Sequence, residues 1–404
     1  MRLLFCWELG ANFGHLSAIA GLQRTLRDAG HELVFAVADL RAARELLGDE
    51  AALLQAPLWP RFTSRGSRNE VASFADVLAP LGFSDASILG PVIDGWLSLF
   101  KALQPEVTIA DHSPAAQLAA RIAGVPLVTL GTGFTQPPLD YEALPPLRTD
   151  IAPALPESVL LDAANAVLER RSTRSFAGLA DLLRPDMRIV IGLPELDPYR
   201  SFRRELLCAP PGGYPTPSSS VTRPRIPHVF AYLGAELPGL EAKVQVLCDL
   251  SHPVEIHVRG GDRFLAEFIR LRGKIAHERP ADIRQTLARA THVVSQGGAM
   301  LASEALAAGL PHLMLPLHRE TELNASLVLR SGSGTHVDPS LPAAAFKTSL
   351  IAFLGDTELE QRTSDLAQLL AQRPLPDAGS ELVSALERIG QLGKPLAPRT
   401  APQS

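Results

Sequence analysis

Two polar side chains in the first half of the sequence have the types needed for acid–base chemistry. His15 stands in GANFGHLSAIA (residues 10–20), after an apolar run and at the start of a helix-like pattern. Asp111 stands in VTIADHSPAAQLAARIAG (107–124), again directly after an apolar run. A histidine can act as a general base near neutral pH, and an aspartate can orient it and stabilise its imidazolium. The alternatives are structural: a locally hydrogen-bonded histidine, and an aspartate that caps the helix beginning near Pro114.

A second candidate site lies in SQGGAMLASEALAAGLP (295–311) and PLHRETELNA (316–325). A strand-like run leads into Gly297 and Gly298, and a helix-like pattern follows at once. Two glycines let the backbone approach a phosphate, and a helix N-terminus offers free N–H groups and a positive dipole end. Glu304, further along this helix, can accept hydrogen bonds from a ribose diol. Alone, the glycines are an ordinary tight turn and Glu304 is a solvated helix residue, but the combination favours a nucleotide site.

The elements that must position these residues alternate between strands and helices. Residues 2–7 and 33–38 are apolar runs on either side of an amphipathic helix that starts near Leu16 and stops at Gly30, which predicts a parallel βαβ unit. Further strands are predicted at 106–110, 126–131, 228–234, 254–258, 292–295 and 312–316. In open parallel sheets, ligands bind beyond the carboxyl ends of the strands, where the candidate residues stand. Gly10 and Gly14 lack the spacing and the third glycine of G-x-G-x-x-G, which excludes a nicotinamide-type dinucleotide turn.

Residues 209–227 interrupt this alternation. Proline, glycine and serine dominate the segment and no apolar periodicity survives, so it is predicted to be an interdomain linker. The predicted organisation is a first domain (1–208), the linker, a second domain (228–392) and a disordered tail (393–404). The fold class is α/β, with two Rossmann-like domains facing across a cleft.

The second candidate site resembles the donor-binding region of inverting GT-B glycosyltransferases. Two groups of this family are similar: the UDP-glycosyltransferases of natural-product and macrolide metabolism, and the enzyme that adds N-acetylglucosamine to the peptidoglycan lipid intermediate. The Gly297–Gly298 pair is similar to the first group, and the GAM…SEALAAGLP run to the second. The resemblance spans both domains and is weak over 59–105 and 135–225, where the acceptor is normally held. It implies that 1–208 is the acceptor-binding domain and 228–392 the nucleotide-sugar-binding domain.

The resemblance implies that His15 is the base that deprotonates an acceptor hydroxyl or amine and that Asp111 is its partner, with His112 a bystander. It implies that the donor is a nucleotide diphosphate sugar, a UDP-sugar as co-substrate, with no further cofactor and no metal. The residues implied in donor binding are Gly234, Gln296, Gly297 and Gly298 near the phosphates, Glu304 on the ribose, and Glu320, Thr321 and Asn324 on the sugar hydroxyls.

Three positions depart from the family pattern. Gln296 replaces the usual histidine, Glu320–Thr321 replaces an Asp-Gln pair, and no proline follows His15. Gln296 keeps open the alternative of a non-catalytic GT-B protein that activates a partner. A nucleotide-sugar 2-epimerase of GT-B fold is the other alternative, since it keeps the donor site but needs carboxylates around the sugar.

The composition of the sequence limits the kinds of partner that the protein can bind and the cellular compartment in which it is expected. A net charge of −5 argues against nucleic-acid binding, and three widely spaced cysteines form no metal or disulfide pattern. The N-terminus lacks a signal-peptide pattern and no run approaches the roughly 20 apolar residues of a membrane span, which predicts a cytoplasmic protein. Five aromatic residues favour an apolar small-molecule or lipid-like acceptor, with core packing as the alternative: Trp59, Phe62, Phe74, Trp96 and Phe134.

Overall fold

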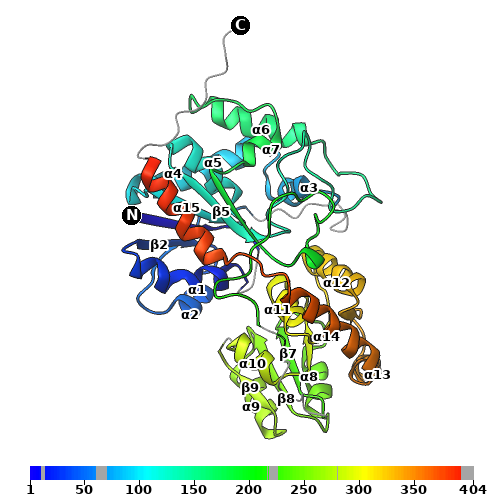
Figure 1. The fold of residues 1–404 in the computed structure, drawn as a ribbon. Helices are drawn as coiled ribbons and strands as arrows, with labels where there is room; N and C mark the ends of the chain where they lie inside the picture. The colour runs from blue at the N-terminus through cyan, green and yellow to red at the C-terminus, as the bar shows by residue number, and fades with distance from the viewer. Residues whose placement is uncertain (11–13, 61–70, 216, 218–225, 280, 393–404) are drawn as a thin grey trace. The chain divides into compact units, whose positions relative to one another are not determined.

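The computed structural model describes residues 1–10, 14–60, 71–215, 217, 226–279 and 281–392 (Figure 1). Two compact units make up the chain. Unit 1 contains Met1–Ile191, Ser201–Gly212 and Pro376–Ser404, and unit 2 contains Gly192–Arg200 and Gly213–Leu375.

Unit 1 is built on a parallel six-stranded sheet of order β3-β2-β1-β4-β5-β6. Its strands are β1 (Arg2–Trp7), β2 (Glu32–Val37), β3 (Ala52–Gln55), β4 (Val107–Asp111), β5 (Leu127–Thr132) and β6 (Met187–Ile191). Its helices are α1 (Gly14–Asp28), α2 (Leu40–Leu47), α3 (Phe74–Leu78), the short η1 (Ala79–Leu81), α4 (Ala86–Leu103), α5 (Pro114–Ala123), α6 (Glu157–Glu169), α7 (Leu179–Leu183) and α15 (Ala378–Leu392). The order of the strands reverses between β1 and β4, which makes the carboxyl ends of these two strands the expected ligand edge.

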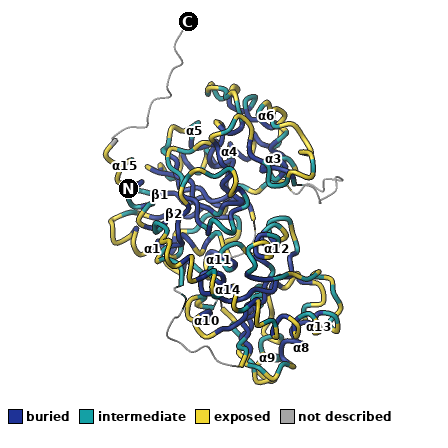
Figure 2. Tube along the Cα trace, turned by 45° about the vertical axis from the view of Figure 1, so that its right-hand side comes forward, coloured by how far each residue is buried: buried dark blue, intermediate teal, exposed yellow. Residues whose placement is uncertain are grey.

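The core of unit 1 lies between this sheet and its helices, and Figure 2 shows its strands in dark blue. Helix α4 belongs to that core, because it packs beside α5 and α6 and buries Ile93, Trp96 and Phe100. By length and composition α4 would also suffice to cross a membrane. Its buried side chains give it the character of a core helix instead.

Unit 2 repeats the same plan, with the parallel sheet order β12-β11-β10-β7-β8-β9. Its strands are β7 (Val229–Gly234), β8 (Val254–Arg259), β9 (Ile275–His277), β10 (His292–Ser295), β11 (His312–Met314) and β12 (Gly334–His336). Its helices are the short η2 (Pro194–Leu196), α8 (Leu240–Cys248), α9 (Arg263–Leu271), α10 (Ile283–Arg289), α11 (Ala299–Ala307), α12 (Arg319–Ser331), α13 (Ala343–Leu354) and α14 (Thr357–Ala371). Here the strand order reverses between β7 and β10.

Two separate parallel sheets were predicted, and the structure confirms them. The predicted domain limits differ from the structure at two places. Helix α15, predicted to be part of the second domain, belongs to unit 1, where Figure 1 shows it in red among blue and cyan elements. Its apolar stripe packs against α1 and β6, and fully buries Ala378, Leu382, Ala385 and Leu386.

The second difference is the segment Gly192–Arg200, predicted to be part of the first domain, which belongs to unit 2. Leu193 packs there with Leu306 and Leu370 in one small apolar cluster, which attaches this segment to unit 2. Within the predicted linker, Ala209 still pairs with Asp377 in unit 1. Residues 216 and 218–225 of the linker and the predicted tail, 393–404, lie outside the described residues.

Candidate functional site

In unit 1, the structure places the two predicted acid–base residues in contact. His15 stands in the first turn of α1, which follows β1, and Asp111 is the last residue of β4. Because β1 and β4 are neighbours in the sheet, the two residues meet at its carboxyl edge. His15 Nδ1 lies 3.1 Å from Asp111 Oδ1, and the side chains are only 10% and 4% exposed.

The surroundings fix this pair. The imidazole stacks on the indole of Trp7, with 5.7 Å between ring centroids. Gly10 adopts a φ of +92°, and a Cβ there would lie 2.5 Å from His15 Nε2, so glycine is required for both conformation and space. A Cβ at Gly131 would lie 3.0 Å from Asp111 Oδ1 and 2.5 Å from Thr135 Oγ1. The absence of a side chain at Gly10 and Gly131 therefore leaves the space in which His15 and Asp111 meet. We call His15 and Asp111 the dyad.

The His15–Asp111 pair consists of a buried carboxylate that faces an imidazole, and this arrangement affects the pKa of the carboxylate. Burial raises the pKa of Asp111, and the charge and hydrogen bond of His15 oppose that rise. A carboxylate held against an imidazole orients the ring and stabilises the imidazolium that forms when the ring takes up a proton, which is the role of an orienting partner beside a general base. The alternative in which Asp111 caps α5 is not what the structure shows, since its carboxylate bonds His15 instead.

Sequence reasoning missed the residue that does cap α5. Glu8 follows β1, and its carboxylate accepts the backbone N–H groups of Ala116 at 2.6 Å and Ala115 at 3.3 Å, and the indole N–H of Trp59 at 2.8 Å. Burial raises the pKa of Glu8 to about 7, and these hydrogen bonds oppose the rise. The sequence feature that could have indicated this role is a charged residue directly after a predicted buried strand.

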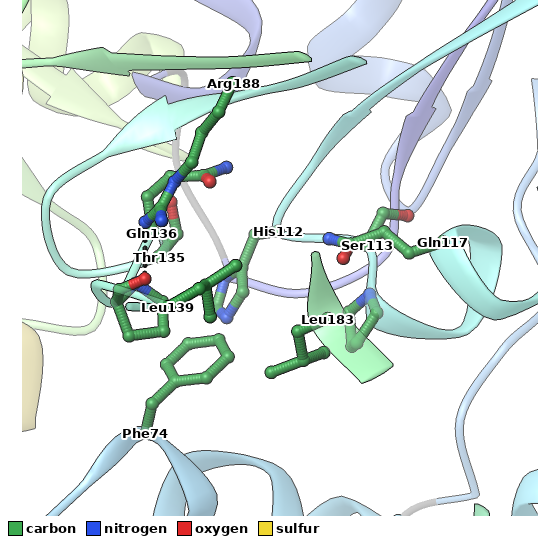
Figure 3. Close-up of a pocket in the computed structure, with 11 residues that line it drawn as sticks. Phe74, His112, Ser113, Gln117, Thr135, Gln136, Leu139, Leu183 and Arg188 are labelled. Atoms are coloured by element: carbon green, nitrogen blue, oxygen red, sulfur yellow. Dashed lines mark hydrogen bonds between the residues drawn. The ribbon is translucent and has the colours of Figure 1, made fainter. Parts of the chain in front are cut away.

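A small pocket opens in unit 1 next to the dyad (Figure 3). Its lining residues come from α3, the start of α5, the loop after β5, α7 and β6: Phe74, His112, Ser113, Pro114, Gln117, Thr135, Gln136, Pro137, Leu139, Leu183 and Arg188. The sequence had marked only Phe74 among them as an acceptor residue. Figure 3 shows the His112 ring pointing into the space between Phe74, Leu139 and Leu183.

The other aromatic candidates have different places. Phe134 is buried and meets the His112 ring edge-on at 6.4 Å. Trp96 is fully buried in the core, as the packing alternative predicted. Trp59 is bonded to Glu8 and stacks with Phe83, while Phe62 lies outside the described residues.

In unit 2, the Gly-Gly turn joins β10 to α11, beside the strand reversal. Gly297 has a φ of +89°, and a Cβ there would lie 3.2 Å from both Met314 Sδ and the Thr321 carbonyl oxygen. Gly298 has an ordinary φ of −63°, and a Cβ there would meet nothing within 4 Å. The fold itself thus demands glycine at 297, whereas at 298 the space in front of the first turn of α11 is open.

Three predicted donor residues have unengaged polar groups within the described part of the chain. The side-chain nitrogen of Gln296 is buried without a hydrogen-bond partner there. Glu304, on α11, is half-buried, and desolvation of its carboxyl raises its pKa to about 7, with the charge of Arg284 opposing the rise. Glu320 stands half-buried in the first turn of α12. Neither of these two carboxylates has a hydrogen-bond partner among the described residues.

The remaining predicted donor residues are engaged with the protein itself. The hydroxyl of Thr321 accepts the N–H groups of Leu317 and His318, each at 3.1 Å, and so caps α12. Asn324 Nδ2 donates to the Gly297 carbonyl at 2.9 Å, which holds the turn. The roles predicted for Thr321 and Asn324 on sugar hydroxyls stay predictions.

Gly234 ends β7 on the other side of the strand reversal. The carboxylate of Glu236, which pairs with Arg259, lies against it. Its predicted contact with the donor phosphates stays a prediction. Among the described residues, no group of three or more histidine, cysteine, aspartate or glutamate side chains is placed to hold a metal ion.

Both units therefore have the architecture of the GT-B glycosyltransferases, and comparison with known proteins agrees. No protein-family model matches the chain. Elloramycin glycosyltransferase ElmGT of Streptomyces olivaceus is 25% identical over an alignment of 344 residues that covers 81% of this chain and 79% of that protein. The solved structure of glycosyltransferase VinC in complex with DTDP matches with a TM-score of 0.65 and 18% identity over 97% of this chain and 100% of VinC. The calicheamicin glycosyltransferase CalG4 matches with a TM-score of 0.63 and 18% identity over 99% of each chain.

These matches confirm the predicted GT-B fold. They also support the prediction that the chain is an enzyme of the glycosyltransferase class. Of the two groups that the sequence resembles, the natural-product and macrolide glycosyltransferases are the supported one. The resemblance to the peptidoglycan enzyme stays a prediction.

Proposed function

We propose that this protein transfers a sugar from a nucleotide diphosphate sugar to a hydroxyl group of a small, largely apolar acceptor, with inversion at the anomeric carbon. The observation that carries the proposal is the His15–Asp111 pair, buried at the strand reversal of unit 1 with 3.1 Å between its polar atoms. A paired imidazole at that edge suits a general base, and a histidine that served packing alone would need no buried carboxylate partner.

In this reaction His15 takes the proton of the acceptor hydroxyl while the oxygen attacks the anomeric carbon. The bond from that carbon to the donor diphosphate breaks, and the electron pair leaves with the diphosphate. Asp111 stabilises the imidazolium that forms. A single in-line displacement inverts the anomeric configuration, and the proposal requires no metal.

The donor assignment rests on the Gly-Gly turn of unit 2. Free backbone N–H groups in the first turn of α11 can stabilise the negative charge of the leaving diphosphate, and Gln296 offers a further donor. The open space at Gly298 and the unbonded carboxylate of Glu304 support a phosphate and a ribose as neighbours. The VinC structure, which contains DTDP, supports a nucleotide diphosphate in general. UDP as the nucleotide, and a cytoplasmic location, stay predictions.

The acceptor assignment rests on unit 1. The pocket beside the dyad has apolar walls formed by Phe74, Leu139 and Leu183. The spinosyn rhamnosyltransferase SpnG, solved with spinosyn aglycone, matches with a TM-score of 0.62 and 20% identity over 96% of this chain and 100% of SpnG. That likeness supports a small-molecule acceptor for this chain.

The His15–Asp111 geometry favours a transferase over the two alternatives. A non-catalytic GT-B protein has no use for a paired base, although Gln296 remains the point in its favour. A 2-epimerase would change the donor sugar without any acceptor. Product analysis with a nucleotide sugar alone separates the epimerase from the transferase.

The experiment that tests the dyad is a double-mutant cycle. His15→Ala should lower kcat by about 10²–10⁴ because a general base contributes on that order. Asp111→Asn should lower kcat by the same factor or less. The kcat of the double variant should be little lower than that of His15→Ala, since the effects of residues acting as one unit do not add. Nucleotide affinity should not change, because the residues assigned to the nucleotide belong to unit 2. His336→Ala, at an exposed histidine of β12, is the control.

Additive losses in the double variant would mean that His15 and Asp111 act independently, and the dyad would be abandoned. Full activity of His15→Ala would contradict the proposed base.

A further inference from the structure

His112, which follows Asp111 in the chain, occupies the centre of the pocket in unit 1 (Figure 3). The residue is only 7% exposed. Its ring lies 5.6 Å from the ring of His15 and 6.1 Å from that of Phe74, measured between centroids. The acid–base mechanism proposed above gives this buried imidazole no role.

The polar atoms of this imidazole are unsatisfied. Neither Nδ1 nor Nε2 of His112 has a hydrogen-bond partner within the part of the chain that the structure describes. Leaving a buried polar group without a partner costs about 1–3 kcal/mol. The carbonyl of the nearby Leu9 accepts the Trp7 indole N–H at 2.6 Å instead. An unpaired side chain in the core is expensive enough to need a reason.

The backbone of His112 is also held in an uncommon conformation. Its φ is +43°, in the left-handed region that non-glycine residues seldom adopt. The His112 carbonyl accepts the N–H of Leu9 at 3.1 Å, which ties the two strand ends together. This conformation directs the ring into the pocket, where it remains without a partner.

The charge state limits which ligand the ring can bind. Burial lowers the pKa of His112 to about 3, and the charge of His15 adds to this effect, while the Leu9 backbone weakly opposes it. The ring is therefore neutral at physiological pH, with one N–H donor and one acceptor nitrogen. A neutral imidazole has no charge with which to attract an anion, but it complements a hydroxyl, which also donates and accepts.

The other lining residues agree with an uncharged ligand. Arg188, the cation of the pocket, lies 3.4 Å from Glu205, a carboxylate that it shares with Arg203, and donates to the Pro137 carbonyl, so its guanidinium is engaged with the protein. Figure 3 shows the apolar side chains of Phe74, Leu139 and Leu183 around the His112 ring. The cavity holds about 20 Å³, which is room for one hydroxyl-sized group rather than for a whole ring system.

We propose that His112 binds a second hydroxyl of the acceptor, distinct from the hydroxyl that attacks the sugar, and thereby determines acceptor specificity. This inference rests on the proposed function, because that function brings the acceptor to the dyad beside the pocket. The substrate class it defines is an apolar, uncharged molecule that carries two hydroxyl groups. His112 is thus a specificity-determining residue in a site where the sequence indicated only a bystander.

The test uses the full chain and two probes that differ by one hydroxyl, 2,3-dihydroxynaphthalene and 2-naphthol, with their dissociation constants measured by calorimetry. The wild-type protein should bind the diol about 5- to 10-fold more tightly, the value of one buried hydrogen bond. His112→Phe, which keeps the ring and removes both nitrogens, should abolish that preference. His112→Asn, which tolerates the left-handed conformation and keeps a donor and an acceptor, should retain part of it.

Two controls separate binding from stability. His112→Phe should stay folded, since the loss of two unpaired buried nitrogens offsets the strain of phenylalanine at a φ of +43°, and its melting temperature checks this. His336→Phe, at an exposed site, should leave the preference for the diol unchanged. A crystal structure of the wild-type protein with the diol should show a ligand oxygen within hydrogen-bond distance of the His112 ring.

A diol preference that survives in His112→Phe would overturn the inference, as would an ordered water that stays on His112 when the diol is bound. Equal affinity of the wild-type protein for both probes would also overturn it. If the preference depends on His112 but no sugar is transferred to any acceptor, the proposed function fails and the pocket assignment stands.

Discussion

Gly297 and Gly298 are neighbours in the turn before α11, yet they lack a side chain for different physical reasons. Gly297 is required by the fold, through its positive φ and the close approach of Met314 and Thr321. Gly298 is free of both constraints, so any requirement for glycine there must come from a ligand. The two positions therefore separate folding from binding within a single turn.

Gly298→Val should abolish binding of nucleotide sugars and leave the melting temperature unchanged, because the added side chain occupies the space where phosphate would meet the backbone. Gly297→Ala should lower the melting temperature, since alanine at that φ is strained. Thermal-shift assays with and without UDP measure both effects. Unchanged nucleotide affinity in Gly298→Val would make the phosphate assignment wrong.

At the scale of elements, the N-terminus of α5 is capped by a side chain from the end of a neighbouring strand. Its own preceding residue, Ser113, makes no capping hydrogen bond from its side chain. The carboxylate of Glu8, from the end of β1, binds the free N–H groups of the first turn instead. The arrangement places a buried acid within the core, where its ionisation opposes folding.

Stability should therefore depend on pH through Glu8. Its pKa is about 7 in the folded protein and 4.5 in an unperturbed glutamate, so the stabilisation is fully present below about pH 4.5 and is lost as the pH rises through 7. The whole loss is on the order of 3 kcal/mol. Glu8→Gln should remove this contribution from the pH profile, measured as the free energy of unfolding in urea from pH 5 to 8.

Glu50→Gln, at an exposed glutamate, is the control and should leave the profile unchanged. Glu304, with a pKa raised to about 7 in unit 2, should supply a second contribution of the same sign that Glu8→Gln does not remove. Burial lowers the pKa of His112 and His312 to about 3, and these two histidines contribute in the opposite direction below about pH 6.5. The Glu8 contribution is therefore the difference in unfolding free energy between the wild-type protein and Glu8→Gln, and a difference that does not fall from pH 5 to 8 would contradict the direction argued here.

At the scale of the whole molecule, the chain passes between the two units after Ile191, Arg200, Gly212 and Leu375. The last passage returns the C-terminal part of the chain to unit 1, where α15 closes the apolar surface of α1 and β6. Leu22, on α1, lies close enough to Gly379 that a Cβ there would come within 2.7 Å. Unit 1 is thus incomplete until the C-terminal helix has been made.

Truncation after Leu375 should therefore destabilise unit 1 rather than unit 2, because removal of α15 exposes apolar surface on α1 and β6. Hydrogen exchange measured by mass spectrometry should show lost protection in peptides from α1 and β6, and unchanged protection in peptides from α11. Truncation after Leu392, which retains α15, is the control. Equal loss of protection in α11 would contradict the assignment of α15 to unit 1.

The sequence by itself determined the two parallel sheets. The central strands are apolar runs because helices cover both of their faces, and that local pattern located β1, β2, β4 and β5 as well as β7, β8, β10 and β11 within two residues. The four strands it did not reveal, β3, β6, β9 and β12, are the edge strands of the two sheets. Edge strands have one unpaired side and are short or partly exposed, so their composition carries a weaker signal.

The sequence also placed His15, Asp111 and the Gly-Gly turn at strand ends, because each directly follows or closes an apolar run. Only the tertiary structure decided which of these ends meet. His15 and Asp111 are 96 positions apart in the chain, and their contact depends on β1 and β4 being neighbours at the strand reversal. The buried roles of Glu8 and His112, and the return of α15 to unit 1, likewise arise from side-chain packing between distant segments. The hydrophobic periodicity of a segment does not predict such contacts. It indicates which face of a helix or strand is buried, but not which other segment buries it.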